Sequence, residues 1–309
     1  MFRQIVKSVY LCGNLKTMTE GTKKKDVALV LSSGGARGLA HIGAIEELEA
    51  QGYQITSIAG CSMGALIGGV YAAGKLKEFR EWMKTMDKKK MLELTDFSFS
   101  LSHLVKGTRI IEAIMEFVPD IAIEDLPIPY CAVATDWKGG QEVVFRKGSL
   151  FSAIRASISL PTFYEPVRRN GMILIDGGVV NPIPLNRVKR HKGDILVGVD
   201  VSGHDYKAQS EVHDEFNERR KHNRSLAAQV LDKLIPDNLD FNYYTMLSRT
   251  SSLMIRQNSI LMAKLLKPDM LVDIQMSRYG GFDYDKSEKF VTIGRLKTSL
   301  TISKYEQSV

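Results

Sequence analysis

Apolar and polar positions divide the chain into short buried runs separated by glycine-rich turns. Val27 to Leu31 is continuously apolar, which is typical of a central strand in a parallel sheet. Ile55 to Ala59 is a second such run, and the amphipathic spacing over Leu39 to Leu48 predicts a helix between them. Strand, glycine loop, helix and strand in this order indicate β-α-β units with right-handed crossovers, and therefore a parallel sheet.

The pattern continues as helices and strands up to about residue 201. Apolar faces and alternation predict helices at 65–73, 75–90, 108–117 and 149–157, and strands at 130–135, 141–146, 172–175 and 194–201. Residues 96–106 are rich in serine and phenylalanine without a clear period, and we interpret them as a mobile loop or lid. A long charged helical region follows at 205–266, and a last strand and a last helix are predicted at 268–275 and 286–299.

These elements divide the chain into three parts. Residues 1–26 form an N-terminal appendage, residues 27–201 an α/β domain with a mainly parallel sheet, and residues 202–309 a mostly helical C-terminal extension packed on that domain. The appendage is polar and ends in Lys23 to Lys25, so we interpret it as a solvated tail. Apolar residues at helical spacing near its start leave an interfacial membrane anchor as the alternative.

Composition narrows the class of protein. The 309 residues are 44% hydrophobic and 25% charged, which is typical of a folded soluble protein. The three cysteines are widely spaced and odd in number, so they indicate a reducing compartment and no metal cluster. No apolar run reaches the length of a membrane span, and the first residues are too polar for a signal peptide, so we expect a cytoplasmic protein.

The net charge of +7 fits an anionic lipid surface or an anionic substrate. Aromatic residues are not interleaved with the basic ones, and we therefore expect no nucleic-acid partner. A peripheral contact with a lipid surface is the partner class that this balance favours.

The pentapeptide Gly60-Cys61-Ser62-Met63-Gly64 lies between the apolar run at 55–59 and the predicted helix at 65–73. A serine flanked by two glycines at a strand-to-helix turn is typical of a nucleophile elbow, in which the tight turn exposes the serine on a strained backbone. The alternative is an ordinary N-capping serine between two glycines. The chain must therefore supply a base and oxyanion donors before Ser62 can be interpreted as a nucleophile.

The glycine loop after the first strand can supply such donors. Gly34 and Gly35 lack side chains, so their amides can approach a substrate closely at the start of a helix. A nucleotide-phosphate loop is the alternative, but the first glycine of the dinucleotide fingerprint is absent. The stretch Gly69 to Lys75 resembles a phosphate-binding loop only superficially, because Leu76 replaces the Mg²⁺-binding hydroxyl residue.

The base is either an aspartate or a histidine. A hydrolase triad in this fold class needs a late histidine, and of the six histidines only His204 follows a predicted strand in the right order. Asp176 ends another predicted strand and precedes two glycines, which suits a carboxylate that faces a neighbouring strand end. An ordinary Asp-Gly turn is its alternative interpretation. We interpret His41 as a packing residue behind the glycine loop.

Three motifs in this order resemble the signatures of the patatin-like phospholipase family. They are the glycine loop Ser33-Gly34-Gly35-Ala36-Arg37-Gly38, the elbow Gly60-Cys61-Ser62-Met63-Gly64 and the turn Asp176-Gly177-Gly178. The flanking stretches are also similar to the family, namely Leu39 to Gly43, Ala156 to Pro161 and Asn181 to Pro184. The resemblance covers about 27–201 and departs at Ser33, where the family usually has glycine.

The resemblance implies a three-layer α/β/α sandwich and a dyad of Ser62 as nucleophile and Asp176 as base, with His204 as a bystander. It also implies that the amides of Gly34, Gly35 and Ala36 form the oxyanion hole. Arg37 would set the shape of the loop or bind a substrate phosphate. The implied chemistry is hydrolysis of lipid acyl esters through an acyl-enzyme, with no metal and no cofactor.

We therefore expect a phospholipase A or lysophospholipase type of serine esterase that acts on a lipid or lysolipid. Phospholipids, lysophospholipids and neutral glycerides all stay open as substrates. The alternative function is a regulatory or interaction protein that keeps the fold with little turnover, for which the charged region 205–266 would offer a partner surface.

Overall fold

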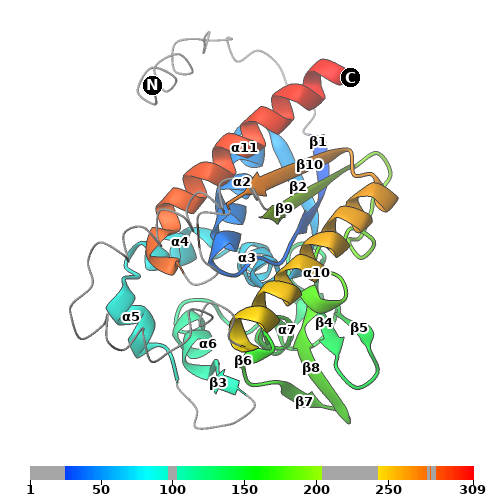
Figure 1. Cartoon of the computed structure of the whole chain (residues 1–309). Coiled ribbons are helices and arrows are strands. Elements are labelled where there is room, and N and C mark those ends of the chain that lie inside the picture. The colour runs from blue at the N-terminus through cyan, green and yellow to red at the C-terminus, as the bar shows by residue number, and fades with distance from the viewer. Residues whose placement is uncertain (1–24, 97–102, 204–242, 277–278, 280–282) are drawn as a thin grey trace, which may run out of the picture.

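The described part of the chain is built around one eight-stranded sheet (Figure 1). A computed structural model describes residues 25–96, 103–203, 243–276, 279 and 283–309. The strands of the sheet are β1 (Lys25–Leu31), β2 (Tyr53–Cys61), β4 (Tyr130–Asp136), β5 (Gln141–Phe145), β7 (Val167–Arg169), β8 (Met172–Asp176), β9 (Ile195–Gly203) and β10 (Met270–Gln275). Two short strands outside this sheet pair with each other, β3 (His103–Val105) and β6 (Thr162–Tyr164).

The central part of the sheet is parallel, as the sequence predicts. Neighbouring strands in the order β10-β9-β1-β2-β4 all run in the same direction. The other three strands are antiparallel additions, because β5 and β8 both pair with β4 and β7 pairs with β8. The parallel strands bring their carboxyl ends to one edge of the sheet, where ligand sites form in α/β folds.

Helices cover both faces of the sheet. The described helices are α2 (Ala40–Ala50), α3 (Met63–Ala72), α4 (Leu76–Lys84), α5 (Lys88–Glu93), α6 (Thr108–Met115), α7 (Leu150–Ser157), α10 (Tyr243–Leu266) and α11 (Ser287–Ser308). Single 3₁₀ turns add η1 (Gly35–Leu39), η2 (Ile123–Asp125), η3 (Gly177–Val179) and η5 (Tyr284–Lys286). None of the described helices is long and apolar enough to cross a bilayer.

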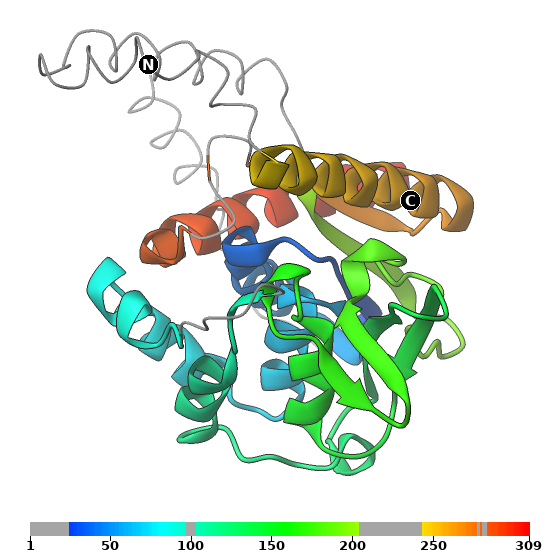
Figure 2. The same cartoon turned by 60° about the horizontal axis from the view of Figure 1, so that its bottom comes forward.

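The period of β1 shows how the layers form. Val27, Leu29 and Leu31 belong to a large core that contains the buried residues of α2, α3 and α11. Ala28 and Val30 belong to a smaller core on the opposite face, which α10 covers (Figure 2). Because both faces of β1 are buried, its sequence is apolar throughout rather than alternating. The expected three-layer α/β/α sandwich is thereby confirmed.

Helices α2 and α11 approach each other so closely that only glycine fits between them. A Cβ at Gly43 would lie 1.9 Å from the carbonyl oxygen of Val291, and a Cβ at Gly294 would lie 2.0 Å from that of Ala40. The contact joins residues from opposite ends of the described chain. It also fixes the end of α2 that follows η1, and so it holds the glycine loop in place.

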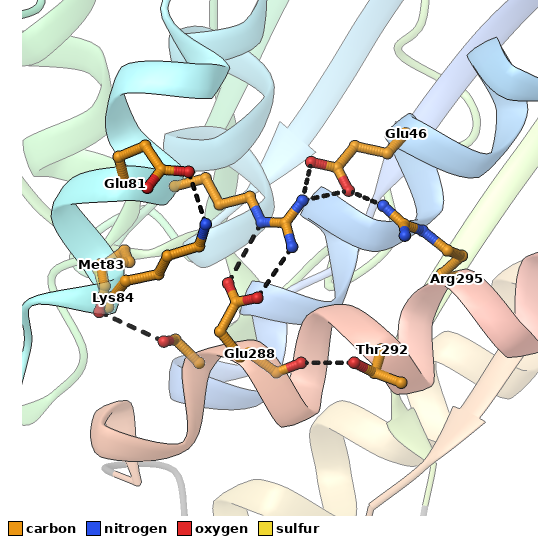
Figure 3. Close-up of polar contacts among 9 residues, drawn as sticks. Glu46, Glu81, Met83, Lys84, Glu288, Thr292 and Arg295 are labelled. Atoms are coloured by element: carbon orange, nitrogen blue, oxygen red, sulfur yellow. Dashed lines mark hydrogen bonds and ion pairs between the residues drawn. The ribbon is translucent and has the colours of Figure 1, made fainter.

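Ion pairs surround this helix contact (Figure 3). Glu46 of α2 lies between the guanidinium groups of Arg80 and Arg295, and Arg80 also binds Glu288 of α11. Arg80, whose side chain is 23% exposed, thus bridges the two carboxylates. The pairs tie α2, α4 and α11 into one layer on the same face of the sheet.

The structure corrects two of the predicted elements. Residues 75–90 form two helices, because α4 ends at Lys84 and the carboxylate of Asp87 caps a new helix by accepting a hydrogen bond from the amide of Lys90. The predicted apolar face is right, since Phe79 and Met83 are buried. Within the predicted loop at 96–106, residues 103–105 form β3, and residues 97–102 lie outside the described part.

The C-terminal part of the chain contributes to the central sheet as well as to the helical layers. The strand predicted at 268–275 is β10, which pairs with β9, and the last helix extends beyond its predicted end to Ser308. Of the long helical region predicted at 205–266, the structure describes α10. Residues 204–242 and 1–24 lie outside the described part.

Candidate active site

Strand register brings Ser62 and Asp176 together. β2 and β8 both pair with the same edge of β4, and β5 pairs with the other edge. Cys61 of β2 is opposite Val133, and Asp176 of β8 is opposite the next residue, Ala134. The two strands therefore meet end to end beside β4. The residue that follows β2 is Ser62, so it emerges next to the carboxylate that ends β8.

Ser62 has the strained backbone that a nucleophile elbow requires. Its φ is 53° and its ψ is −121°, a conformation that non-glycine residues adopt rarely and at a cost. A Cβ at Gly60 would lie 2.4 Å from the carbonyl oxygen of Gly64, and a Cβ at Gly64 would lie 2.2 Å from that of Leu31. Both glycines of the motif are therefore required by close backbone approaches rather than by flexibility.

Ser62 and Asp176 are hydrogen-bonded to each other. The Oγ of Ser62 donates to Oδ2 of Asp176 at 2.5 Å, and the amide of Gly178 donates to Oδ1 at 2.7 Å. Both residues are buried, with 9% of Ser62 and 4% of Asp176 exposed. Burial raises the pKa of Asp176 to about 6, although the hydrogen bonds from Ser62 and Gly178 act in the opposite direction. At neutral pH the carboxylate is ionised and more basic than an ordinary aspartate.

Ser157 supports the elbow through two hydrogen bonds, a role that the sequence does not reveal. Its Oγ accepts a hydrogen bond of 2.9 Å from the amide of Ser62 and donates one of 2.6 Å to the carbonyl oxygen of Val133. Ser157 is fully buried at the end of α7. The motif pattern includes this serine only as a flanking residue, and a long-range contact between α7 and the elbow carries no local sequence signal.

The glycine loop lies beside Ser62, as predicted. Gly34, Gly35 and Arg37 line the same cavity as the serine, whereas Ala36 is fully buried and does not line it. Gly35 has a φ of 57°, which favours glycine. Amides at the start of a helix have no intrahelical acceptor, so those at the start of η1 are available to an anion.

Arg37 connects the loop to the cavity. Its Nε donates to the carbonyl oxygen of Gly34 at 3.3 Å, and the side chain lines the cavity. Burial lowers the pKa of Arg37, while the negative charge of Asp200 acts in the opposite direction. The guanidinium thus binds a carbonyl oxygen of the loop and borders the cavity.

His41 supports the loop through a contact with its backbone. Its Nε2 lies 2.9 Å from the carbonyl oxygen of Ser32, so it donates to that oxygen, and the ring is fully buried. Burial lowers its pKa to about 4, and the ring stays neutral. His204, the candidate third member of a triad, lies outside the described residues.

Cys61 packs with its Sγ 4.0 Å from Oδ1 of Asp176, and burial raises the pKa of its thiol well above the usual range.

Ser62 opens into a large apolar cavity of about 470 Å³. Most of its wall comes from α4, α5, α6, α10 and β6, and the sequence does not indicate this role because these elements lie outside the three motifs. The wall includes Leu66, Phe79, Trp82, Met83, Met91, Leu94, Ile110, Ile111, Ile114, Ile158, Leu160, Phe163, Tyr164, Ile255 and Tyr284. Such a cavity suits a long hydrocarbon group whose polar end lies at Ser62.

Comparisons with known proteins agree with the motifs. Residues 29–188 match the family of patatin-like phospholipases. An uncharacterized NTE family protein of Mycobacterium tuberculosis is 45% identical over 183 residues, which are 59% of this chain and 51% of that protein. Neuropathy target esterase sws of Drosophila melanogaster is 32% identical over 186 residues, which are 58% of this chain and 13% of that protein.

Two further similarities extend this set. Patatin-like phospholipase domain-containing protein 6 of Mus musculus is 34% identical over 187 residues, covering 58% of this chain and 14% of that protein. The crystal structure of VipD from Legionella pneumophila superposes with a TM-score of 0.45 and 13% identity, covering 92% of this chain and 68% of that chain. This chain spans about half the length of the mycobacterial relative and a much smaller part of the two animal proteins.

Proposed function

Because the chain belongs to the patatin-like phospholipase family, we propose that it is a serine carboxylic-ester hydrolase that cleaves acyl esters of lipids. One observation carries the proposal: the Oγ of Ser62 donates to Oδ2 of Asp176 at 2.5 Å, at the wall of an apolar cavity. A nucleophile, a base in direct contact with it and room for a hydrocarbon chain are the three requirements of lipid acyl hydrolysis.

In the first half of the reaction, the Oγ of Ser62 attacks the ester carbonyl carbon while its proton passes to Oδ2 of Asp176. Amides of the glycine loop at Gly34 and Gly35 stabilise the negative charge that develops on the carbonyl oxygen. The tetrahedral intermediate collapses as the protonated Asp176 gives its proton to the leaving alcohol oxygen. The acyl group then remains as an ester on Ser62.

In the second half, water attacks the acyl-enzyme. Asp176 takes a proton from the water and returns it to the Oγ of Ser62 as the fatty acid leaves. The reaction needs a carboxylate that can bind and release a proton in each half, and the raised pKa of about 6 suits this task at neutral pH.

The cavity favours a phospholipase A or lysophospholipase type of substrate. Its apolar wall accommodates an acyl chain, and Arg37 lies where a phosphate of the headgroup can meet a cation. A neutral glyceride would use the same acyl cavity and make no use of Arg37. The comparison of an anionic phospholipid with a neutral glyceride therefore tests the role of this residue.

A serine-reactive fluorophosphonate probe and a lipid panel test the proposed function. We expect the probe to label the wild type and the Ser152→Ala control, in which an exposed serine of α7 is replaced, but not the Ser62→Ala variant. Turnover of phosphatidylcholine, lysophosphatidylcholine and a triglyceride should fall at least about 1,000-fold in Ser62→Ala. Full activity in that variant would refute the dyad, and an unlabelled wild type that turns over no lipid would favour the regulatory alternative.

A further inference from the structure

Helix α10 exposes large apolar side chains on the side that faces away from the sheet. Leu261 and Leu265 are 60% and 76% exposed, and three more residues share their side of the helix: Met246, Leu253 and Met254. At 100° per residue, these five positions span an arc of about 120°. We call them the α10 stripe.

The opposite side of the same helix is also apolar. Met262, Ala263 and Leu266 pack against the smaller core cluster on the sheet. The exposed arc also carries Thr250, Gln257 and Lys264, so the helix is not apolar all round. Five large apolar side chains that water reaches in one arc nevertheless mark the α10 stripe as a surface for an interaction.

The charges of α10 indicate the kind of partner. The sequence 243–266 contains no aspartate and no glutamate. Lys264 and Lys267 are exposed at the C-terminal end of the helix. Arg256 is turned toward the sheet, where it forms ion pairs with Asp200 at 2.9 Å and with Asp273 at 3.3 Å. An outward face that combines apolar and basic side chains without acidic ones complements an anionic lipid surface.

The same helix forms part of the active-site cavity. Ser252 and Ile255 line the cavity that contains Ser62. The Nδ2 of Asn258 donates to the carbonyl oxygen of Val179 at 3.5 Å, three residues after the dyad carboxylate. Val180, the next residue along the chain, is exposed. The α10 stripe thus lies on an element that also borders the dyad.

We propose that the α10 stripe docks on the surface of a membrane that contains anionic phospholipid. The helix lies flat in the interface, with its leucine and methionine side chains among the acyl chains and its lysines among the headgroups. The docked helix places the mouth of the cavity at the source of its substrate. This proposal rests on the proposed function, because only a lipid substrate gives the docked orientation a purpose.

Vesicle flotation tests the docking without any turnover. Ser62→Ala protein is mixed with phosphatidylcholine vesicles that contain about 30 mol% phosphatidylglycerol, or with phosphatidylcholine vesicles alone. We expect binding to the anionic vesicles and a loss of at least about tenfold in partitioning when Leu261→Glu and Leu265→Glu are added. The matched control carries Leu296→Glu and Leu300→Glu on α11, which are 52% and 50% exposed, and should bind as the parent does.

Two further readouts identify other occupants of the α10 stripe. Sedimentation without vesicles detects a second copy of the chain on the α10 stripe. The proposal would be overturned if the parent dimerises, the Leu261→Glu/Leu265→Glu variant does not, and the two bind vesicles equally. Thermal unfolding detects a segment of this chain that covers the α10 stripe. The proposal would also be overturned if the α10 variant, but not the α11 control, has a lower unfolding midpoint than the parent while all three bind vesicles equally. Vesicle binding by a protein that hydrolyses no lipid would leave the docking intact and refute the proposed function.

Discussion

The hydroxyl of Ser157 accepts a hydrogen bond of 2.9 Å from the amide of Ser62. This bond fixes the one residue of the elbow whose φ is positive without being glycine. The same hydroxyl donates to the carbonyl oxygen of Val133, so the elbow is tied to β4 through α7. The strain at Ser62 is therefore balanced by contacts with two other elements of the fold.

Replacing Ser157 with alanine should reduce turnover and stability together. The change leaves the buried amide of Ser62 and the carbonyl oxygen of Val133 without partners, at a cost of about 1–3 kcal/mol for each unsatisfied group. We expect kcat for an ester to fall about 10- to 100-fold, with little change in KM, because the loss acts on the position of Ser62. Ester kinetics and urea unfolding measure the two effects. Ser152→Ala, on the exposed side of the same helix, should change neither.

Replacing Asp176 with asparagine should abolish turnover and stabilise the fold. Burial raises the folded-state pKa of Asp176 to about 6 from an ordinary value of 3.8, so the ionised form is the less stable one in the native protein. Its cost is absent below pH 3.8, grows as the pH rises through that interval and is complete above pH 6. The gain in unfolding free energy should thus be about 2 kcal/mol larger at pH 8 than at pH 4.

Chemical denaturation of both proteins across this range measures the difference. Asparagine keeps an oxygen that can accept from the amide of Gly178, and therefore it isolates the loss of charge. An asparagine variant that is less stable than the wild type at pH 8 would contradict a desolvated carboxylate at this position.

The pH profile of kcat/KM should report one ionisation near pH 6. In the proposed mechanism Asp176 is ionised when it accepts the proton of Ser62, so activity should fall about tenfold per pH unit below its pKa of about 6. His41, with a pKa of about 4, stays neutral in this range and adds no step. The profile of His204→Ala should match that of the wild type. A profile that changes in this variant would instead support a triad.

Filling the cavity should change the preferred length of the acyl chain. Ile110 of α6 is half-buried and lines the cavity, so Ile110→Trp removes room for a hydrocarbon. We expect kcat/KM for a long-chain nitrophenyl ester, relative to a short-chain one, to fall about tenfold. Met115→Trp is the matched control, because Met115 lies on the same helix with its side chain exposed. Equal ratios for the two variants would place the acyl chain elsewhere.

The sequence predicts the elements of the site better than the site itself. Apolar runs with glycine turns locate β1 and β2, because fully buried strands and tight turns both restrict the residues that they accept. The motif around Ser62 predicts the elbow, since close approaches of Leu31 and Gly64 exclude any side chain at two positions. The apolar pattern does not show that β8 is antiparallel. It also does not show that Cys61 and Asp176 are opposite neighbouring residues of β4, because register depends on long-range pairing.

The cavity and its support are the part that the sequence does not reveal. Phe79 and Ile114 occupy ordinary core positions of amphipathic helices, and nothing in their spacing distinguishes a cavity wall from a packed interior. Ser157 is similar, because a buried serine at the end of a helix has many possible partners. Asp87 is different, because its residue type is a local signal for a helix start. The continuous apolar pattern of 75–90 hides this signal, and in the structure Asp87 caps the second of two helices.

The glycine contact between α2 and α11 sets an order of events during protein synthesis. Glu46 and Arg295, which pair beside that contact, are 249 positions apart in the chain. A ribosome-bound chain presents Ser62 and Asp176 long before it presents the helix that covers α2. We expect such a chain, stalled before Ser287, to react poorly with a fluorophosphonate, because the helix that follows the glycine loop still lacks its cover. Emergence of α11 would then be the step that completes the support of the glycine loop.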